Sequence, residues 1–306
     1  MSILVVLIVF VVLFMVFVSA VLLAIGPIML LQPHRRRIDY YRRYTSFLDP
    51  ADLKLPCERL TLKTVDELSL SCWFIPSPQA QGTVIYLHGV SECKIVGLPM
   101  ARMLHEHGFH VFLYDSRRHG DSGGNFCTYG FYEKRDASRV IDYLCSRSDI
   151  RTGKIALFGS SMGAAVAIQV AAADKRVVAV VAESGFATLR TVFDDYQKRM
   201  IKLPWHYLRN IVIKRSEHLA HFKANAVSPA EAVRDIRVPL FLLHGMADTS
   251  IRVSSSELVY TNAHEPKELW LIPGACHSDM AEVGGAEYTR RIVAFFEQTL
   301  REEASS

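Results

Sequence analysis

The strongest apolar pattern in the chain is an unbroken stretch near its beginning. Residues 3–31 carry no charged side chain, and Ser19, Gly26 and Pro27 are the only positions outside the apolar set. About 20 helical residues suffice to cross the hydrocarbon core of a bilayer. A cleavable signal peptide has a basic start and a shorter apolar core, and this stretch has neither. We therefore predict a retained, single-pass transmembrane anchor over residues 1–32.

A basic linker, predicted over residues 33–55, follows the anchor. Five arginines stand close together within residues 35–43, where Asp39 is the only acidic residue: Arg35, Arg36, Arg37, Arg42 and Arg43. Basic residues next to a membrane span favour the cytoplasmic side, so we predict that the rest of the chain lies in the cytoplasm. Tyrosines among the arginines suit an interfacial anchor, whereas a solvated linker is the alternative.

Beyond residue 56 the pattern alternates between apolar runs typical of strands and amphipathic runs typical of helices. Strands are predicted at 57–63, 69–75, 83–87, 110–114, 154–158, 177–181, 239–243 and 268–272, and helices at 98–107, 132–146, 164–173, 254–261 and 286–301. The first two strands flank Asp66-Glu67 and predict a hairpin. Strands that alternate with helices form a mostly parallel sheet with helices on both faces. Residues 187–230 break this rhythm, which predicts an insert.

Composition narrows the class of protein. Hydrophobic residues make up 50% of the chain, an excess that the apolar stretch explains, and the 17 glycines and 12 prolines follow no period. Disordered, collagen-like and low-complexity classes are thereby excluded. A net charge of +4 gives no basis for nucleic-acid binding. The six cysteines form no CxxC pair and no zinc-type spacing, which indicates free thiols, although an even number also permits disulfides.

The most informative motif is Gly159-Ser160-Ser161-Met162-Gly163, which matches G-x-S-x-G between a predicted strand and a predicted helix. A sharp strand-to-helix turn exposes the middle serine above the sheet, and small residues on either side of it avoid a clash. The helix N-terminus behind Ser161 supplies backbone N–H groups for developing negative charge. The alternative is a helix N-cap serine in a nucleotide-binding turn, which the lack of a Gly-rich phosphate motif disfavours.

A nucleophilic serine needs a base that is held by a carboxylate, and both are expected downstream in the order Ser, Asp or Glu, His. Asp248 and His277 follow successive predicted strands. Because the carboxyl ends of parallel strands meet at one edge of a sheet, both side chains can converge on Ser161. We therefore predict Ser161, Asp248 and His277 as nucleophile, acid and base. Glu183, which follows an earlier strand, is the second candidate for the acid.

Three further motifs need an interpretation. His88-Gly89-Val90 ends a predicted strand, and its turn places the Val90 N–H beside that of Met162, which predicts an oxyanion hole. Ser122 lies in a Gly-Asp-Ser-Gly-Gly string like that around the nucleophile of trypsin-like proteases, but those are all-β proteins, so we interpret it as a turn. His105 and His107 stand two residues apart on a predicted helix and point in different directions, which disfavours a metal site.

Together these residues resemble the α/β-hydrolase superfamily, and within it the membrane-anchored, serine aminopeptidase-like or esterase-like hydrolases with one N-terminal transmembrane helix. The likeness runs from about residue 57 to 302 and rests on the motifs at 88–89, 115–124, 159–163, 244–248 and 274–277. It implies an α/β-hydrolase domain over residues 56–306 with a helical cap over about 187–230. It also implies the triad Ser161, Asp248 and His277, and an oxyanion hole from the Val90 and Met162 backbones.

The predicted function is that of a serine hydrolase that cleaves an acyl ester or thioester through a covalent acyl-enzyme. A lipid-derived ester is one such substrate. The alternatives are a peptidase or an acyltransferase with the same triad, and a non-catalytic scaffold. No metal and no organic cofactor are implied. The expected partners are a small acyl substrate and a lipid membrane, not nucleic acid, and the sequence leaves the oligomeric state open. From Phe186 to Ala224 the predicted cap carries eight Lys or Arg against three Asp or Glu. This basic surface either binds an anionic membrane or is a solvated face of the cap.

Overall fold

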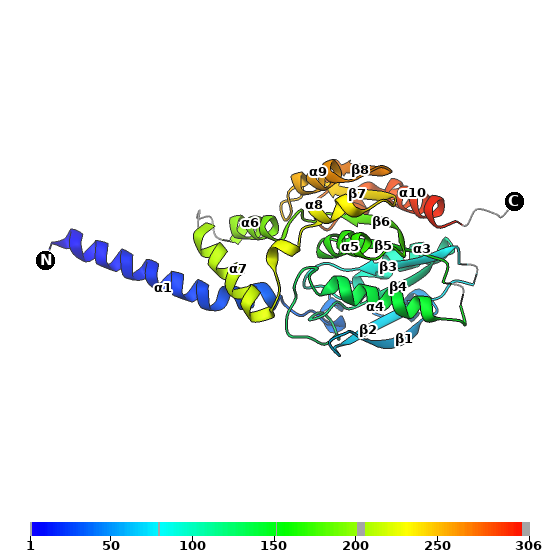
Figure 1. Ribbon diagram of the computed structural model, residues 1–306, viewed down its shortest axis with the longest axis horizontal. Coiled ribbons are helices and arrows are strands. Elements are labelled where there is room, and N and C mark those ends of the chain that lie inside the picture. Colours follow the sequence, from blue (N-terminus) through cyan, green and yellow to red (C-terminus); the bar gives the residue numbers. More distant parts are fainter. Residues whose placement is uncertain (1, 79, 151, 201–205, 302–306) are drawn as a thin grey trace.

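The first helix stands out from the rest of the chain in a computed structural model that describes residues 2–78, 80–150, 152–200 and 206–301 (Figure 1). This helix, α1, runs over Ile3–Leu31 and begins behind Ser2, whose side chain accepts a hydrogen bond from the Val5 N–H. Within the described residues it is the one helix long and apolar enough to cross a membrane.

The centre of the body is a single sheet. Its strands are β1 (Glu58–Lys63), β2 (Ser69–Ile75), β3 (Gly82–Leu87), β4 (His110–Tyr114), β5 (Lys154–Ser160), β6 (Val177–Glu183), β7 (Leu240–Gly245) and β8 (Lys267–Ile272). They lie in the order β1-β2-β4-β3-β5-β6-β7-β8. β2 pairs antiparallel with β1 and β4, and the other neighbouring strands pair in parallel. The predicted hairpin and the predicted, mostly parallel sheet are confirmed.

Helices cover both faces of this sheet, as predicted. On one face lie α3 (Leu98–Glu106) and α10 (Met280–Leu300), and on the other lie α4 (Glu133–Ser146), α5 (Met162–Ala173) and α9 (Val253–Asn262). α10 begins earlier than the predicted residue 286 and is kinked at Gly285, where φ is 53°. The sequence pattern missed its first turns because Gly284 and Gly285 are poor helix formers.

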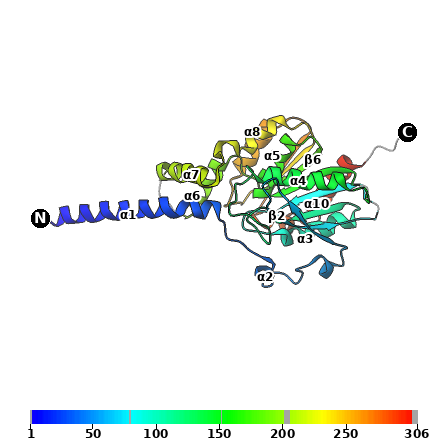
Figure 2. The same cartoon turned by 60° about the horizontal axis from the view of Figure 1, so that its bottom comes forward.

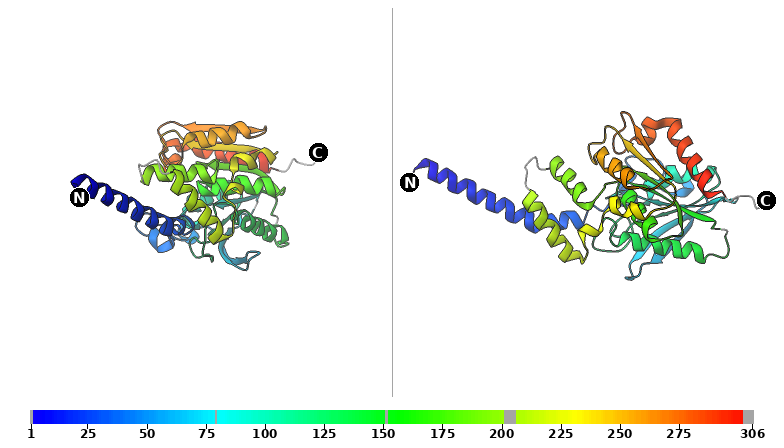
Figure 3. Two further views of the ribbon diagram at one scale, coloured as in Figure 1. Left: turned by 60° about the vertical axis from the view of Figure 1, so that its left-hand side comes forward. Right: turned by 45° about the horizontal axis from the view of Figure 1, so that its top comes forward.

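The insert between β6 and β7 is helical. It holds α6 (Leu189–Met200), α7 (His206–Ala220) and α8 (Pro229–Ala232), with 3-10 turns at Ala224–Ala226 and Val233–Asp235. Figures 2 and 3 show α7 beside the end of α1 that joins the body. Leu189, Val192 and Phe193 bury their side chains and fix α6 to the core. Of the basic residues expected on this insert, Lys202 and the side chains of Lys198 and Arg199 lie outside the described residues.

The carboxyl ends of the parallel strands point toward this insert. β6 ends at Glu183, and the chain enters α6 at Leu189 after a short connection. The segment that leaves α1 carries a short helix, α2 (Ile38–Tyr41), and a 3-10 turn at Pro50–Leu53, and another 3-10 turn at Lys94–Gly97 precedes α3. Polar side chains that follow the strands therefore meet at the edge of the sheet that faces α6 and α7.

Candidate active site

Ser161 occupies the sharp turn between β5 and α5. Its backbone has φ 55° and ψ −115°, a strained conformation for a residue with a side chain. The turn is held by the Ser161 N–H, which donates to the Glu183 carbonyl at 2.8 Å. Such strain persists only where the surrounding structure enforces it, and here it lifts the Ser161 hydroxyl off the end of the sheet.

The two glycines of the motif are required by the close approach of backbone segments. A Cβ atom on Gly159 would lie 2.2 Å from the Gly163 carbonyl oxygen, and one on Gly163 would lie 1.9 Å from the Leu87 carbonyl oxygen. Both distances are far below van der Waals contact. The G-x-S-x-G spacing therefore lets α5 start directly behind Ser161, close against the ends of the neighbouring strands β3 and β5.

His277 connects Ser161 with Asp248. His277 Nδ1 lies 2.6 Å from Asp248 Oδ2, and His277 Nε2 lies 2.9 Å from Ser161 Oγ. A carboxylate only accepts hydrogen bonds, so Nδ1 donates to Asp248 and Nε2 is left to accept the Ser161 hydroxyl proton. The structure thus brings together the three side chains predicted as nucleophile, acid and base, from turns after β5, β7 and β8.

Asp248 is held as a carboxylate. Its Oδ1 accepts the backbone N–H groups of Ser250 at 2.7 Å and Ile251 at 3.0 Å. Burial by itself raises the pKa of this carboxyl, but hydrogen bonds from His244 and His277, with the Ile251 N–H, outweigh it and hold the pKa of Asp248 well below its usual range. Asp248 is therefore a carboxylate at neutral pH.

His244 is a neighbour of Asp248 to which the sequence analysis assigned no role. Its Nε2 lies 3.3 Å from Asp248 Oδ2 and 3.0 Å from the Ile251 carbonyl oxygen, and its Nδ1 lies 2.7 Å from Ser256 Oγ. Two acceptors face Nε2, so this nitrogen carries the proton. The signal in the sequence was the position of His244, four residues before Asp248 and at the end of the strand that Asp248 follows.

Glu183, the second candidate for the acid, makes different contacts. It accepts the Tyr288 hydroxyl at 2.5 Å and the Ser160 hydroxyl at 3.1 Å. Burial raises the pKa of Glu183, and these two hydrogen bonds only partly oppose the rise. The carboxylate that hydrogen-bonds the imidazole is that of Asp248, while Glu183 lines the pocket beside the nucleophile.

The turn after β3 abuts the nucleophile. A Cβ atom on Gly89 would lie 3.3 Å from Ser161 Cβ, so this turn passes directly over the serine. The Gly89 N–H is occupied, because it donates to Glu92 Oε2 at 2.8 Å. Val90 lines the same pocket as Ser161, and Met162 is the first residue of α5. The oxyanion hole built from the Val90 and Met162 N–H groups remains a prediction.

A pocket of about 660 Å³ holds Ser161 and His277 in its wall. Its apolar side comes from the 3-10 turn before α3 and from α3 itself: Val96, Pro99, Met100 and Met103. Glu92 and Glu183 add carboxyl groups. Arg36, from the segment after α1, and Tyr196, from α6, also line it. The pocket therefore presents one apolar wall and several polar groups close to the nucleophile.

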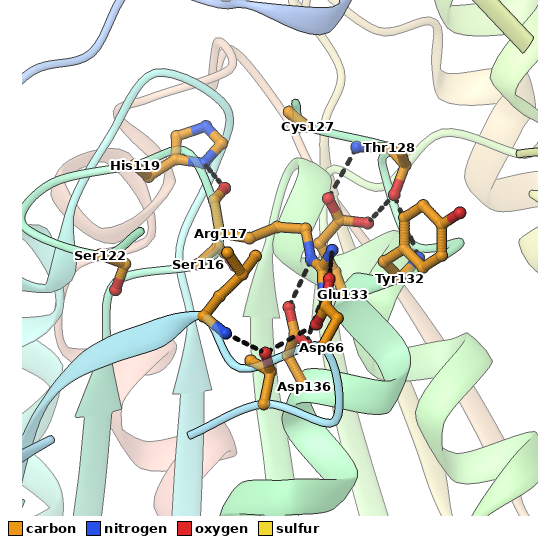
Figure 4. A network of polar contacts seen from close by, with 12 residues as sticks. Asp66, Ser116, Arg117, His119, Ser122, Cys127, Thr128, Tyr132, Glu133 and Asp136 are labelled. Atoms are coloured by element: carbon orange, nitrogen blue, oxygen red, sulfur yellow. Dashed lines mark hydrogen bonds and ion pairs between the residues drawn. The ribbon is translucent and has the colours of Figure 1, made fainter. Parts of the chain in front are cut away.

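The Gly-Asp-Ser-Gly-Gly string is a structural turn, as interpreted from the sequence. Ser122 is buried, donates to the Asp115 carbonyl oxygen at 2.6 Å and accepts the Ser71 N–H at 2.9 Å. Figure 4 shows Arg117 between Asp66 and Asp136, which it contacts at 3.1 Å and 2.7 Å.

Among the described residues no group of three or more His, Cys, Asp or Glu side chains is arranged to hold a metal ion.

Comparisons with known proteins identify a matching family and several similar chains. A family model described as serine aminopeptidase, S33, matches residues 78–226. The chain is similar to YfhR of Escherichia coli K12, with 31% identity over 247 residues, 78% of this chain and 80% of YfhR. It is 32% identical to YqkD of Bacillus subtilis over 198 residues and spans 65% of the length of that protein. An esterase of Pyrococcus furiosus superposes with a TM-score of 0.72 at 26% identity, over 89% of this chain and 99% of the esterase.

Proposed function

Since the chain belongs to the α/β-hydrolase superfamily, we propose that it is a serine hydrolase that cleaves acyl esters or thioesters through a covalent acyl-enzyme. The observation that carries this proposal is the hydrogen-bonded series from Ser161 Oγ through His277 to Asp248, with contacts of 2.9 Å and 2.6 Å. A serine in this setting has a base for its proton, and the base has a fixed tautomer.

In the acylation step, Ser161 Oγ attacks the carbonyl carbon of the substrate while its proton moves to His277 Nε2. The cation formed on His277 is stabilised by the Asp248 carboxylate, which stays ionised. The carbonyl oxygen gains negative charge, for which the Val90 and Met162 N–H groups and the N-terminus of α5 are the proposed donors. Collapse of this intermediate expels the alcohol or thiol, which takes the proton from His277.

Deacylation repeats these steps with water as the nucleophile. His277 Nε2 accepts a proton from the water while the water oxygen bonds to the acyl carbon. The Ser161–acyl bond then breaks as His277 returns this proton to Ser161 Oγ. The products are a carboxylic acid and free Ser161, so the reaction consumes one water molecule.

The apolar wall of the pocket supports an acyl substrate. Met100 and Met103 offer flexible apolar surface in the wall of the pocket that holds Ser161, and Val96 adds to it, which suits a hydrocarbon chain. Ester hydrolysis is also the activity named for the Pyrococcus furiosus protein, which superposes over most of this chain.

A peptidase or an acyltransferase with the same triad is the alternative within this mechanism. The family description names an aminopeptidase, and two carboxyl groups, those of Glu92 and Glu183, line the pocket where a substrate amine would find a counter-charge. Hydrolysis of p-nitrophenyl esters compared with aminoacyl p-nitroanilides separates the two activities. Transfer to an added alcohol in place of water identifies an acyltransferase.

Labelling by a fluorophosphonate probe tests the nucleophile. We expect Ser161→Ala to abolish both labelling and ester hydrolysis, because no other hydroxyl contacts His277 Nε2 among the described residues. Ser160→Ala is the matched control, since Ser160 is adjacent but bonds to Glu183. Labelling that survives in Ser161→Ala and disappears in Ser122→Ala would reject the assignment, and no labelling of the wild type would favour the non-catalytic scaffold.

The proposal extends to the N-terminal helix. α1 is long and apolar enough for a membrane span, and a signal sequence passes the same test. We assign it as a retained single-pass anchor with the catalytic domain on the cytoplasmic side, because the arginines at 35–37 and 42–43 follow it directly.

A further inference from the structure

The last turns of α1 belong to the folded body. Leu31 is 0% exposed and joins the main core, and Pro27 is buried as well. The Leu31 carbonyl accepts the Cys127 N–H at 2.8 Å, and the Leu30 carbonyl accepts the Tyr129 hydroxyl at 2.9 Å. A cleaved leader would take these contacts with it, so they indicate that α1 stays in the mature protein.

α1 also packs along the insert helix α7. A Cβ atom on Gly26 would lie 2.9 Å from Val212 Cγ2, so the glycine lets the two helices approach closely. Figures 1 and 3 show α7 lying against the body-side part of α1. Below the helix, the Arg35 guanidinium donates to the Arg118 carbonyl at 3.1 Å and to the Ser122 carbonyl. The helix is thus fixed on one side by α7 and at its end by the hydrolase core.

No other part of the chain that the structure describes covers the first half of α1. Every side chain from Ile3 to Phe17 is between 41% and 87% exposed, and all of them are apolar. A continuous apolar surface on every side of a helix matches lipid hydrocarbon, since a protein partner would cover one side and leave the rest in water. The occupant of this surface is therefore the interior of a bilayer.

The length of α1 places α7 relative to the bilayer. If residues 3–22 cross the hydrocarbon core of about 30 Å, Gly26 lies about 6 Å beyond it, in a headgroup layer about 5–8 Å thick. Val212, which contacts Gly26, then lies at the depth of the headgroups. Lys214 and Arg215 follow on α7 and are exposed, so they can meet lipid phosphates there.

The same segments form part of the catalytic pocket. Arg36 lines the pocket and comes five residues after Leu31, which limits its distance from the end of α1 to about 18 Å. Tyr196, on the helix α6 that precedes α7, lines it as well. We infer that docking of α1 on α7 holds the pocket against the bilayer surface and that the substrate is an acyl ester of a membrane lipid. This inference rests on the proposed serine hydrolase function. Water is the co-substrate, and the products are a fatty acid and the remaining alcohol.

A cysteine cross-link tests the docking in membranes. The Cβ positions of residues 26 and 212 are 3.7 Å apart, within the range of about 3.5–4.5 Å that a disulfide needs. Full-length Gly26→Cys/Val212→Cys is expected to form the 26–212 disulfide on mild oxidation, identified by mass spectrometry of the linked peptides. Ala24→Cys/Val212→Cys is the control, because Ala24 is exposed, and it is expected to form none. Equal cross-linking of both pairs, or none in the first pair, would overturn the docking.

Two esters test the substrate class. Full-length protein in phosphatidylcholine vesicles is assayed with soluble p-nitrophenyl butyrate and with a long-chain diacylglycerol in the same bilayer. Gly26→Leu separates α1 from α7, and we expect it to lower hydrolysis of the bilayer ester at least about tenfold through loss of positioning, with the soluble ester unchanged. Ala24→Leu adds the same side chain on the exposed face and is expected to change neither rate.

The outcomes separate this inference from the proposed function. Hydrolysis of the soluble ester without hydrolysis of the bilayer ester by the wild type would overturn the inference and leave the serine hydrolase intact. Equal effects of Gly26→Leu and Ala24→Leu on the bilayer ester would also overturn it. Failure with both esters, together with no fluorophosphonate labelling, would reject the proposed function itself. If Gly26→Leu does not fold, the cross-link and the wild-type ester comparison still decide.

Discussion

Replacement of Asp248 by Asn is the sharpest test of the proposed triad, because the structure dictates how the new amide will lie. Asp248 Oδ1 accepts two backbone N–H groups, from Ser250 at 2.7 Å and Ile251 at 3.0 Å. An amide keeps these bonds only if its oxygen takes the Oδ1 position. Its NH₂ group must then take the Oδ2 position, 2.6 Å from His277 Nδ1.

This orientation turns the imidazole into the wrong tautomer. With an NH₂ donor facing it, Nδ1 has to accept, so the proton moves to Nε2. Nε2 then points a hydrogen at Ser161 Oγ and cannot take the serine proton. The cation on His277 also loses its carboxylate partner. We expect kcat to fall about 10⁴-fold, which is about 5.5 kcal/mol of transition-state stabilisation.

The assay is steady-state hydrolysis of a p-nitrophenyl ester, run beside the rate of fluorophosphonate labelling, with folding checked by circular dichroism. Glu183→Gln is the matched control, because Glu183 lines the same pocket but bonds to Tyr288 and Ser160. We expect it to lower kcat no more than about tenfold. An Asp248→Asn enzyme that keeps most of its kcat, or a larger loss in Glu183→Gln, would refute the reasoning.

Three further predictions concern stability and topology. Gly163→Ala should lower the free energy of unfolding by about 4 kcal/mol or more, because its Cβ would lie 1.9 Å from the Leu87 carbonyl oxygen, although helix propensity alone favours Ala by about 1 kcal/mol. Urea titration measures both variants, and Gly274→Ala is the control. A Cβ at Gly274 meets no atom within 4 Å but sits at φ 77°, so this variant should lose only about 1–2 kcal/mol. Equal losses in the two variants would contradict the steric argument. Because the pKa of Glu183 is raised, the folded chain binds the proton of this carboxyl group more tightly than the unfolded chain does. The resulting contribution to the free energy of unfolding is full below the unfolded pKa of about 4.3 and is lost as pH rises through the folded pKa. Burial also raises the pKa of Asp136, to about 6, so stability should decline in both proteins. Urea titrations from about pH 4 to 8 should show a steeper decline in the wild type than in Glu183→Gln, and parallel curves would show that Glu183 does not contribute to it. A membrane-impermeant maleimide should leave the exposed thiols Cys145 and Cys276 unmodified in intact cells and modify them after lysis, whereas modification before lysis would place the domain outside.

Steric and packing requirements of neighbouring residues allow much of this fold to be predicted from the sequence. Strand-like and helix-like runs report which side chains must be buried, so the order of elements and the mostly parallel sheet followed from the pattern. The G-x-S-x-G motif carries its own geometry, because Gly159 and Gly163 are needed wherever a strand turns this sharply into a helix. Each of these signals is contained within a few neighbouring residues.

Contacts between distant segments were decided only by the tertiary structure. Glu183 ends β6 and Asp248 lies in the loop after β7, at the same edge of the sheet, and the sequence pattern made either one a candidate partner of His277. The loop after β7 turns the Asp248 carboxylate toward the imidazole, while Tyr288 and Ser160 hold that of Glu183. The apolar pattern predicted a membrane helix but gave no sign that Leu31 enters the core or that Gly26 meets Val212. A hydrophobic pattern records that a side chain leaves water, not which surface receives it, because burial is favourable against any apolar partner and only the packing of whole elements selects one.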